Sequence, residues 1–310
     1  MTQKPPSVSI VVPLYNKATS VEATLSSVLS QSMADVEVIV VDDGSTDMGP
    51  QIVATFTDKR LRLFQQQNAG VSAARNAGVH ASRADWIAFI DADDVWDSNH
   101  LEILLRASRC DGVIVAFSNV RLQSRPERPA IRRSIPAQKI DDYFAFALSS
   151  GGYPISSSSV LVRRDRLLEC GLFKVGQTMG EDIDMWCRLA CCGSFFYSGA
   201  ESATYNDIPT ANSVAGALDR DAVYPQFAQR LVKMFEANDV PMRLVENAQR
   251  YANFLLLEYA RQLLDRGKFL EARSLLLKQC RPNYDFKRFA KRLLRTSPIG
   301  HAIYALSRRI

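Results

Sequence analysis

The sequence predicts an α/β domain built on a mostly parallel sheet flanked by helices, followed by a smaller, all-helical C-terminal region. Over the first 120 residues, short β-branched apolar runs alternate with stretches of helical spacing, which is the pattern of βαβ units. Beyond about residue 215 the strand signals fade and only helical patterns remain. We therefore expect two domains, at 1–215 and 216–310.

The expected strands are continuous apolar runs, typical of strands that are buried on both faces of a sheet. They are Ser7–Leu14, Val36–Val41, Arg60–Phe64, Asp85–Ile90, Gly112–Val120 and Ser158–Val162.

The expected helices carry apolar residues at helical spacing. They are Ser20–Gln31, Gln51–Phe56, Ala69–Ala81, a helix capped by Asp97 or Ser98 that runs to about Ala107, Glu181–Cys191, Asp221–Glu236, Pro241–Arg266, Phe269–Lys278 and Phe286–Arg295. The polar, basic and proline-bearing stretch Arg121–Arg133 is expected to form an exposed loop.

The composition is that of a globular protein, with 47% hydrophobic and 23% charged residues among 310. The chain has no run of about 18 apolar residues, which a membrane-spanning helix needs. Ile10–Tyr15 is too short for a secretory signal, so we expect a cytoplasmic protein. The six cysteines form no CxxC pair, so reduced thiols are expected. Zinc at Cys187 and Cys191, on one helix face, is the alternative.

Two of the expected strands end in acidic clusters, and ligands of open α/β sheets bind beyond the carboxyl ends of the strands. Asp91-Ala92-Asp93 offers hard oxygen ligands for Mg²⁺ or Mn²⁺ shared with phosphate oxygens. The alternative is a turn that caps the next helix. Asp42 and Asp43 end the other strand, where an acid accepts hydrogen bonds from a base or sugar. An Asx-type turn is the alternative there.

Four motifs occur in order: VSIVVPLYN (Val8–Asn16), VIVVDDGSTD (Val38–Asp47), NAGVSAARNAG (Asn68–Gly78) and WIAFIDADDVW (Trp86–Trp96). Together they closely resemble the inverting family 2 glycosyltransferases, which have a GT-A fold. The resemblance implies metal-dependent transfer of a sugar from a nucleotide diphosphate donor to a glycan or lipid-linked glycan hydroxyl, in bacterial surface polysaccharide biosynthesis. A UDP-sugar is the expected donor, with dTDP- and GDP-sugars as alternatives.

The resemblance also implies a role for each motif. Asp43 would accept a hydrogen bond from the nucleotide base. Asp91 would contact the ribose or the metal, and Asp93 would ligate Mn²⁺ or Mg²⁺. The nucleotide pocket would be lined by Pro13, Tyr15, Asn16, Asp42, Asp43, Arg75 and Asn76. From the residues alone, Arg75 is equally a solvated charge on an ordinary helix.

Gly180-Glu181-Asp182 resembles the acid pair of the family at a helix start. An acceptor hydroxyl is a poor nucleophile, so a carboxylate must take its proton during attack. Asp182 is the expected base, with Glu181 supporting it. The alternative is that both acids only complement the helix dipole. Many relatives carry Arg-x-His farther on, but the corresponding stretch here, Tyr205–Pro209, has neither residue.

The net charge of +5 comes from the C-terminal segment Arg281–Ile310. This segment holds eight Lys or Arg and one Asp, a net charge of +7, and the rest of the chain has a net charge of −2. The amphipathic pattern of Tyr284–Arg295 predicts contact with an anionic membrane surface, so that the cytoplasmic protein would be peripheral on the inner face of the membrane. The alternative is packing on its own domain.

Without interleaved aromatics, we expect no nucleic-acid binding. Tyr251–Lys278 is expected to be a docking or homodimerising helical hairpin.

Two other functions fit parts of the pattern. A nucleotidyltransferase would show a Gly-rich, basic loop after the first strand, and Pro13–Lys17 is not such a loop. A non-catalytic scaffold could keep the fold without the chemistry, but the intact acid motifs argue against it. The absence of a GxGxxG motif after the first strand argues against a dinucleotide oxidoreductase.

Overall fold

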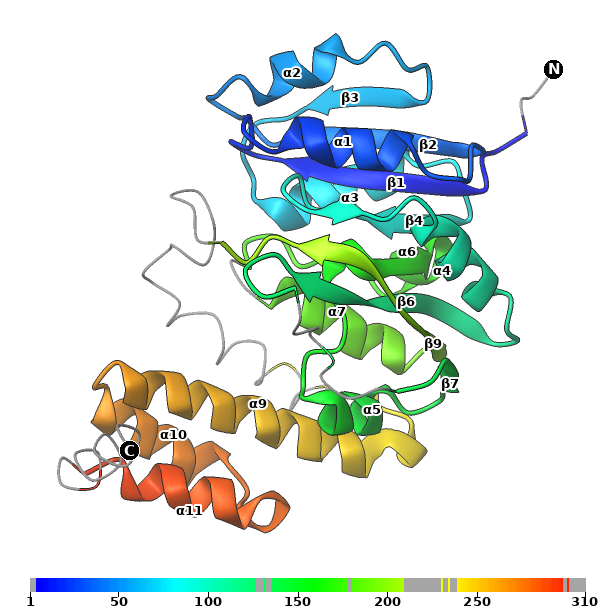
Figure 1. The fold of residues 1–310 in the computed structure, drawn as a ribbon. Coiled ribbons are helices and arrows are strands. Elements are labelled where there is room, and N and C mark those ends of the chain that lie inside the picture. Colours follow the sequence, from blue (N-terminus) through cyan, green and yellow to red (C-terminus); the bar gives the residue numbers. More distant parts are fainter. Residues whose placement is uncertain are drawn as a thin grey trace.

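A computed structural model describes residues 4–126, 131, 135–177, 180–208, 230, 234, 239–297 and 300. Among these residues, nine strands form one sheet that helices flank on both faces, and the last helices pack beside it (Figure 1). The strands are β1 (Val8–Leu14), β2 (Val36–Asp42), β3 (Leu61–Gln65), β4 (Trp86–Phe89), β5 (Val95–Trp96), β6 (Val113–Leu122), β7 (Gln138–Ile140), β8 (Val160–Arg163) and β9 (Ser194–Tyr205). The helices are α1 (Val21–Leu29), α2 (Gly49–Thr55), α3 (Val71–Ala81), α4 (His100–Ser108), α5 (Tyr143–Ser150), α6 (Arg164–Glu169), α7 (Glu181–Ala190), α9 (Val245–Asp265), α10 (Phe269–Gln279) and α11 (Phe286–Leu294).

The strand order is β3-β2-β1-β4-β8-β6-β9-β5, with β7 paired to β9. The first four strands are parallel, as predicted, whereas β8 runs antiparallel to both β4 and β6. The second half of the sheet is therefore mixed. The α/β fold class and the helical C-terminal region are confirmed.

One local prediction was wrong, and a second, the exposed loop from Arg121, holds only in part, at the exposed turn of residues 123–126. Helix α4 begins at His100, and the Asp97 carboxylate accepts a 2.5 Å hydrogen bond from Arg121 instead of capping the helix. The stretch from Arg121 does not begin as a loop, since β6 extends to Leu122, and Ile131 is buried with its backbone hydrogen-bonded to Asn119. The predicted helix 221–236 lies outside the described residues apart from positions 230 and 234.

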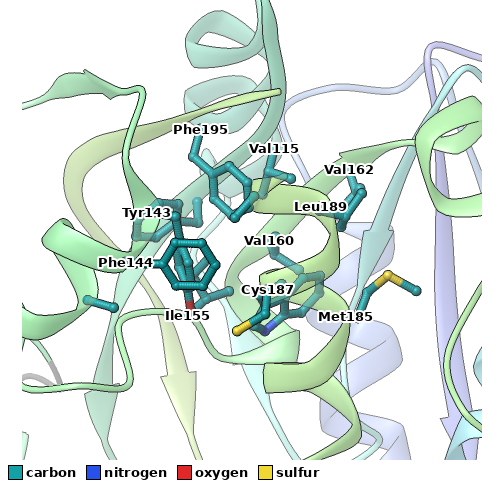
Figure 2. Packing of buried hydrophobic residues seen from close by; sticks show 14 of the residues in the cluster. Val115, Tyr143, Phe144, Ile155, Val160, Val162, Met185, Cys187, Leu189 and Phe195 are labelled. Atoms are coloured by element: carbon teal, nitrogen blue, oxygen red, sulfur yellow. The ribbon is translucent and has the colours of Figure 1, made fainter. Parts of the chain in front are cut away.

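Close packing of α3 on the sheet fixes the position of the residues that this helix carries. At Gly78 an added Cβ would lie 2.3 Å from a methyl of Val11 on β1, so only glycine allows this approach. Helix α7 lies on the same face of the sheet as α3. Its Met185, Cys187 and Leu189 belong to the largest core cluster (Figure 2), which also contains Val11 and Val79.

The C-terminal helices join the molecule through α9. The first half of α9 shares the core of the sheet, and its Tyr251 hydroxyl donates a 2.7 Å hydrogen bond to the Gly152 carbonyl. The second half packs with α10 and α11 around a smaller core. None of the helices in the described ranges has both the length and the apolar character required to cross a membrane.

Candidate functional site

A cavity of about 750 Å³ opens where β1, β2 and β4 end, at the carboxyl edge of the parallel strands. Segments that are far apart in the sequence meet here, because the loops after these strands, α3 and the start of α7 all reach its wall. Of the predicted site residues, those that line the cavity are Pro13, Tyr15, Asp43, Arg75, Asp91, Asp93, Glu181 and Asp182. The carboxylates from three separate segments are thus brought to one cleft.

Arg75 links two of these segments. Its guanidinium donates one 2.8 Å hydrogen bond to Asp91 and another of the same length to Glu181. The side chain is only 3% exposed, so the interpretation of Arg75 as a solvated charge is excluded. The nearby Asp91 and Glu181 carboxylates raise the pKa of Arg75 against the effect of burial, which keeps the guanidinium charged. Arg75 therefore ties the acid after β4 to the acid that begins α7.

Asp43 organises the loop that precedes α3. Its carboxylate accepts hydrogen bonds from the Gln66 side chain (2.7 Å) and from the backbone N–H groups of Ala69 (2.9 Å) and Gly70 (2.8 Å). An ionised carboxylate has about four acceptor positions, so three bonds leave one for a ligand N–H.

Asp182 has the environment of a proton acceptor. Burial raises the pKa of Asp182 to about 7, with a further contribution from the neighbouring Glu181, while the charge of Arg75 opposes the rise. One of its carboxylate oxygens accepts from the backbone N–H of Ile183 at 2.7 Å. A carboxylate with a pKa near neutrality takes up a proton readily without being permanently protonated.

Asp91 and Asp93 are the residues that fit a divalent cation. Each contributes one oxygen to an ion pair in the cavity wall, Asp91 with Arg75 and Asp93 with Lys17. Within the described ranges, no cluster of three or more His, Cys, Asp or Glu side chains is arranged to hold a metal ion alone. Two carboxylates completed by phosphate oxygens and water match the way Mg²⁺ is usually bound.

Three predicted residues do not line the cavity. The Asp42 carboxylate accepts a 2.9 Å hydrogen bond from the backbone N–H of Ser45. Asp42 therefore forms the Asx-type turn that was the alternative to a ligand contact. The Asn76 amide exchanges two hydrogen bonds with the backbone of Phe173 and holds that loop against α3. The Asn16 side chain accepts from the backbone N–H of Thr46 at 2.8 Å.

Sequence reasoning missed other residues of the cavity wall. Asn206, after β9, is one of them, and its backbone N–H donates a 2.8 Å hydrogen bond to the buried Asp94, which lies behind the wall beside the predicted acids. No spacing rule predicts such a contact between distant loops. Among the lining residues that no prediction assigned to the site are Lys17, Ser156, Ser157, Gln177, Tyr205, Asn206, Asp207 and Ile208.

Comparisons with known proteins find similar sequences among glycosyltransferases and in polysaccharide biosynthesis. The uncharacterized glycosyltransferase EpsJ of Bacillus subtilis is 32% identical over 137 residues, 44% of this chain and 40% of the relative. The succinoglycan biosynthesis protein ExoO of Rhizobium meliloti is 38% identical over 122 residues, 39% of this chain and 35% of the relative. The matched part thus covers well under half of these relatives.

Solved structures show the same fold. Residues 1–349 of TarS from S. aureus in complex with UDP match with a TM-score of 0.64 and 17% identity, over 94% of this chain and 81% of that one. The complex of TarS with UDP-GlcNAc matches with a TM-score of 0.62 and 17% identity, over 93% and 90%. The profile of glycosyl transferase family 2 matches residues 9–169, just over half of the 310 residues. The chain therefore belongs to glycosyl transferase family 2.

Proposed function

We propose that this chain is an inverting, metal-dependent glycosyltransferase that moves a sugar from a nucleotide diphosphate donor to a hydroxyl of a glycan or lipid-linked glycan. The observation that carries the proposal is the meeting of Asp43, the Asp91–Asp93 pair and Asp182 in one cavity. The UDP and UDP-GlcNAc complexes of TarS support a UDP-sugar as the donor. ExoO, a succinoglycan biosynthesis protein, supports a role in bacterial surface polysaccharide assembly.

In this proposal the residues divide the work of donor binding. Pro13 and Tyr15 line the nucleotide end of the cavity, and Asp43 accepts an N–H of the base at its remaining acceptor position. Asp91 and Asp93 would hold Mn²⁺ or Mg²⁺. The cation would stabilise the negative charge that develops on the departing diphosphate.

Asp182 acts on the acceptor. As the acceptor oxygen forms a bond to the anomeric carbon, the bond from that carbon to the diphosphate breaks and the hydroxyl proton passes to Asp182. A single displacement inverts the configuration of the sugar. Glu181 supports Asp182 by holding Arg75, whose charge limits the rise of the Asp182 pKa.

Membrane contact is proposed for one face of α11. Arg292 and Arg295 are buried in ion pairs with Glu258 and Asp265 of α9, so part of the basic helix packs on its own chain. Lys287 and Lys291 of the same helix are exposed. Phe286 and Leu294 are also exposed, at 68% and 71%. Basic and apolar side chains together suit an anionic lipid surface. Such contact would make the protein peripheral to the membrane.

Thermal unfolding with candidate donors tests the enzymatic proposal. A ligand that binds only the folded chain stabilises it and so raises its melting temperature. At a ligand concentration one hundred times Kd, the free energy of unfolding increases by about 2.7 kcal/mol. We expect a UDP-sugar to do so with Mn²⁺ or Mg²⁺ present, and Asp93→Ala to remove the metal-dependent part of the shift. Asp111→Ala, at an exposed acid, is the matched control. The proposal is wrong if no UDP-, dTDP- or GDP-sugar shifts the wild-type curve.

A further inference from the structure

The charge of the cavity wall poses a problem for an anionic ligand. Its described lining holds six acids, Asp43, Asp91, Asp93, Glu181, Asp182 and Asp207, but only two basic residues, Lys17 and Arg75. A diphosphate would meet net repulsion unless cations are provided next to its oxygens. One divalent cation at Asp91 and Asp93 offsets part of this charge. A basic side chain within reach of the phosphates would offset more.

Arg75 is not available for that task. Its two terminal nitrogens are already bonded to Asp91 and Glu181, and the side chain is 3% exposed. Moving it toward a phosphate would leave both carboxylates without their partner in a buried place, which is costly. Of the two basic residues in the described lining, only Lys17 has a charge that reaches the open part of the cavity.

Lys17 is held at the cavity by a firmly bonded loop. Asn16 takes a left-handed conformation (φ 52°), and its backbone N–H donates to the Ser45 hydroxyl at 3.0 Å. The next residue, Ala18, donates its backbone N–H to Asp47 at 2.8 Å. Ser20 then bonds the Ala92 carbonyl at 2.9 Å, so the loop is tied directly to the acidic motif.

The Lys17 ammonium pairs with Asp93, and the two side chains are 18% and 19% exposed. The pair is therefore half-buried and faces the cavity. Asp93 is also a carboxylate that suits the divalent cation, so Lys17 and the cation compete for it. A lysine ammonium on a flexible four-carbon chain can exchange one oxygen partner for another nearby.

We propose that Lys17 binds the diphosphate of the donor, giving up Asp93 to the divalent cation and taking a phosphate oxygen in exchange. The inference rests on the proposed function, since it presumes a nucleotide diphosphate in this cavity. In the absence of ligand, Lys17 neutralises Asp93 and keeps it in place. When the ligand is bound, the same ammonium contributes positive charge to the diphosphate.

Calorimetric titration of Lys17→Gln tests this exchange with UDP, uridine and Mn²⁺ as separate probes. With Mn²⁺ present, UDP should bind roughly ten- to a hundredfold more weakly than to wild type, as for a lost hydrogen bond between charged groups. Uridine, which has no phosphate, should bind unchanged. Mn²⁺ alone should bind more tightly, because its competitor for Asp93 has gone. Lys17→Arg should recover most of the UDP affinity, and Lys59→Gln, at an exposed lysine, should match wild type.

The opposite signs of the UDP and Mn²⁺ effects separate exchange from a purely structural role. If Lys17 only holds Asp93 in place, Lys17→Gln will weaken Mn²⁺ and UDP together, and the proposal is wrong. It is equally wrong if UDP affinity is unchanged or if uridine loses as much affinity as UDP. Wild-type protein that fails to bind UDP with Mn²⁺ would overturn the proposed function itself. Unchanged UDP affinity in Lys17→Gln, by contrast, overturns only the role of Lys17.

Discussion

At the scale of single residues, two carboxylates of the cavity differ because their surroundings differ. Asp93 is paired with the Lys17 ammonium, although burial raises its pKa. Asp182 accepts a hydrogen bond from the backbone N–H of Ile183 but, among the described residues, from no charged side chain, and burial raises its pKa to about 7. Carboxylates whose environments separate them in this way commonly take different roles in one reaction. Here Asp93 suits cation binding and Asp182 suits proton transfer.

The raised pKa of Asp182 predicts how activity depends on pH. Asp182 must be ionised to accept a proton, so kcat/KM should fall as the pH decreases below about 7. Asp182→Asn should lower the rate by about 10²- to 10⁴-fold, which is the usual contribution of a general base. A pH–rate profile of wild type and variant checks both. Full activity of Asp182→Asn would contradict the role of this residue.

The same pKa makes a prediction about stability. An aspartate of the unfolded chain ionises near pH 3.9, whereas folded Asp182 holds its proton to about 7. As the pH rises between these values the unfolded state loses its proton first, so this group lowers wild-type stability progressively. Asp182→Asn removes the effect, and its melting temperature relative to wild type should rise from pH 5 to pH 8. A difference that stays constant with pH, as expected for the exposed control Asp111→Asn, would contradict the shift.

At the scale of elements, the amphipathic helix α11 has some basic residues that pack on α9 and others that are exposed to solvent. Phe289 and the buried Arg292 and Arg295 face α9, whereas Lys287 and Lys291 face solvent. The sequence pattern predicted an amphipathic basic helix but could not tell which of its arginines pair within the chain. The exposed Lys287 and Lys291 are the basic residues of this helix that we propose for contact with a lipid surface.

This division predicts which variants affect membrane binding. Replacing Lys287 and Lys291 by glutamine should weaken binding to anionic vesicles by about 2 kcal/mol, or about thirtyfold, without loss of stability. Co-sedimentation with phosphatidylserine vesicles measures this. The matched control replaces the exposed Lys59 and Lys174, which lowers the net charge equally from outside the helical region. Equal binding of the two double variants would contradict a membrane role for α11.

The elements that the sequence predicted best are those in which every residue is buried. β1 and β2 are buried along their whole length, so each is a plain apolar run. β9 was missed because its twelve residues mix buried aromatics with exposed polar residues, and its register against β6 is irregular. α5 was missed because its residues Tyr143–Ser150 are nearly all apolar, which obscures helical spacing.

Within the site, adjacent acids could not be distinguished by sequence. Asp42 and Asp43 are neighbours, yet one closes a turn and the other organises the loop before α3. The contact between Lys17 and Asp93 joins residues 76 positions apart, and no local pattern predicts it. Of the acids that the family resemblance named, all but Asp42 line the cavity. It could not supply the contacts that the distant loops make.

At the scale of the whole molecule, the sheet brings together carboxylates that the chain keeps far apart. β1, β2 and β4 end at one edge, and α3 and α7 close the cavity from the sides through Arg75. The C-terminal helices share the core of the sheet through the first half of α9. The cavity that we propose as the donor site is thus a product of the entire α/β arrangement and not of any single motif.

A crystal structure of the protein grown with UDP and Mn²⁺ tests this account most directly, because the anomalous signal of manganese locates the cation independently. We predict one manganese peak between the diphosphate and the Asp91–Asp93 pair, with the uracil beside Asp43 and Asp182 facing the open end of the diphosphate. Nucleotide bound outside this cavity, or within it with its diphosphate turned away from Asp91 and Asp93, would contradict the account.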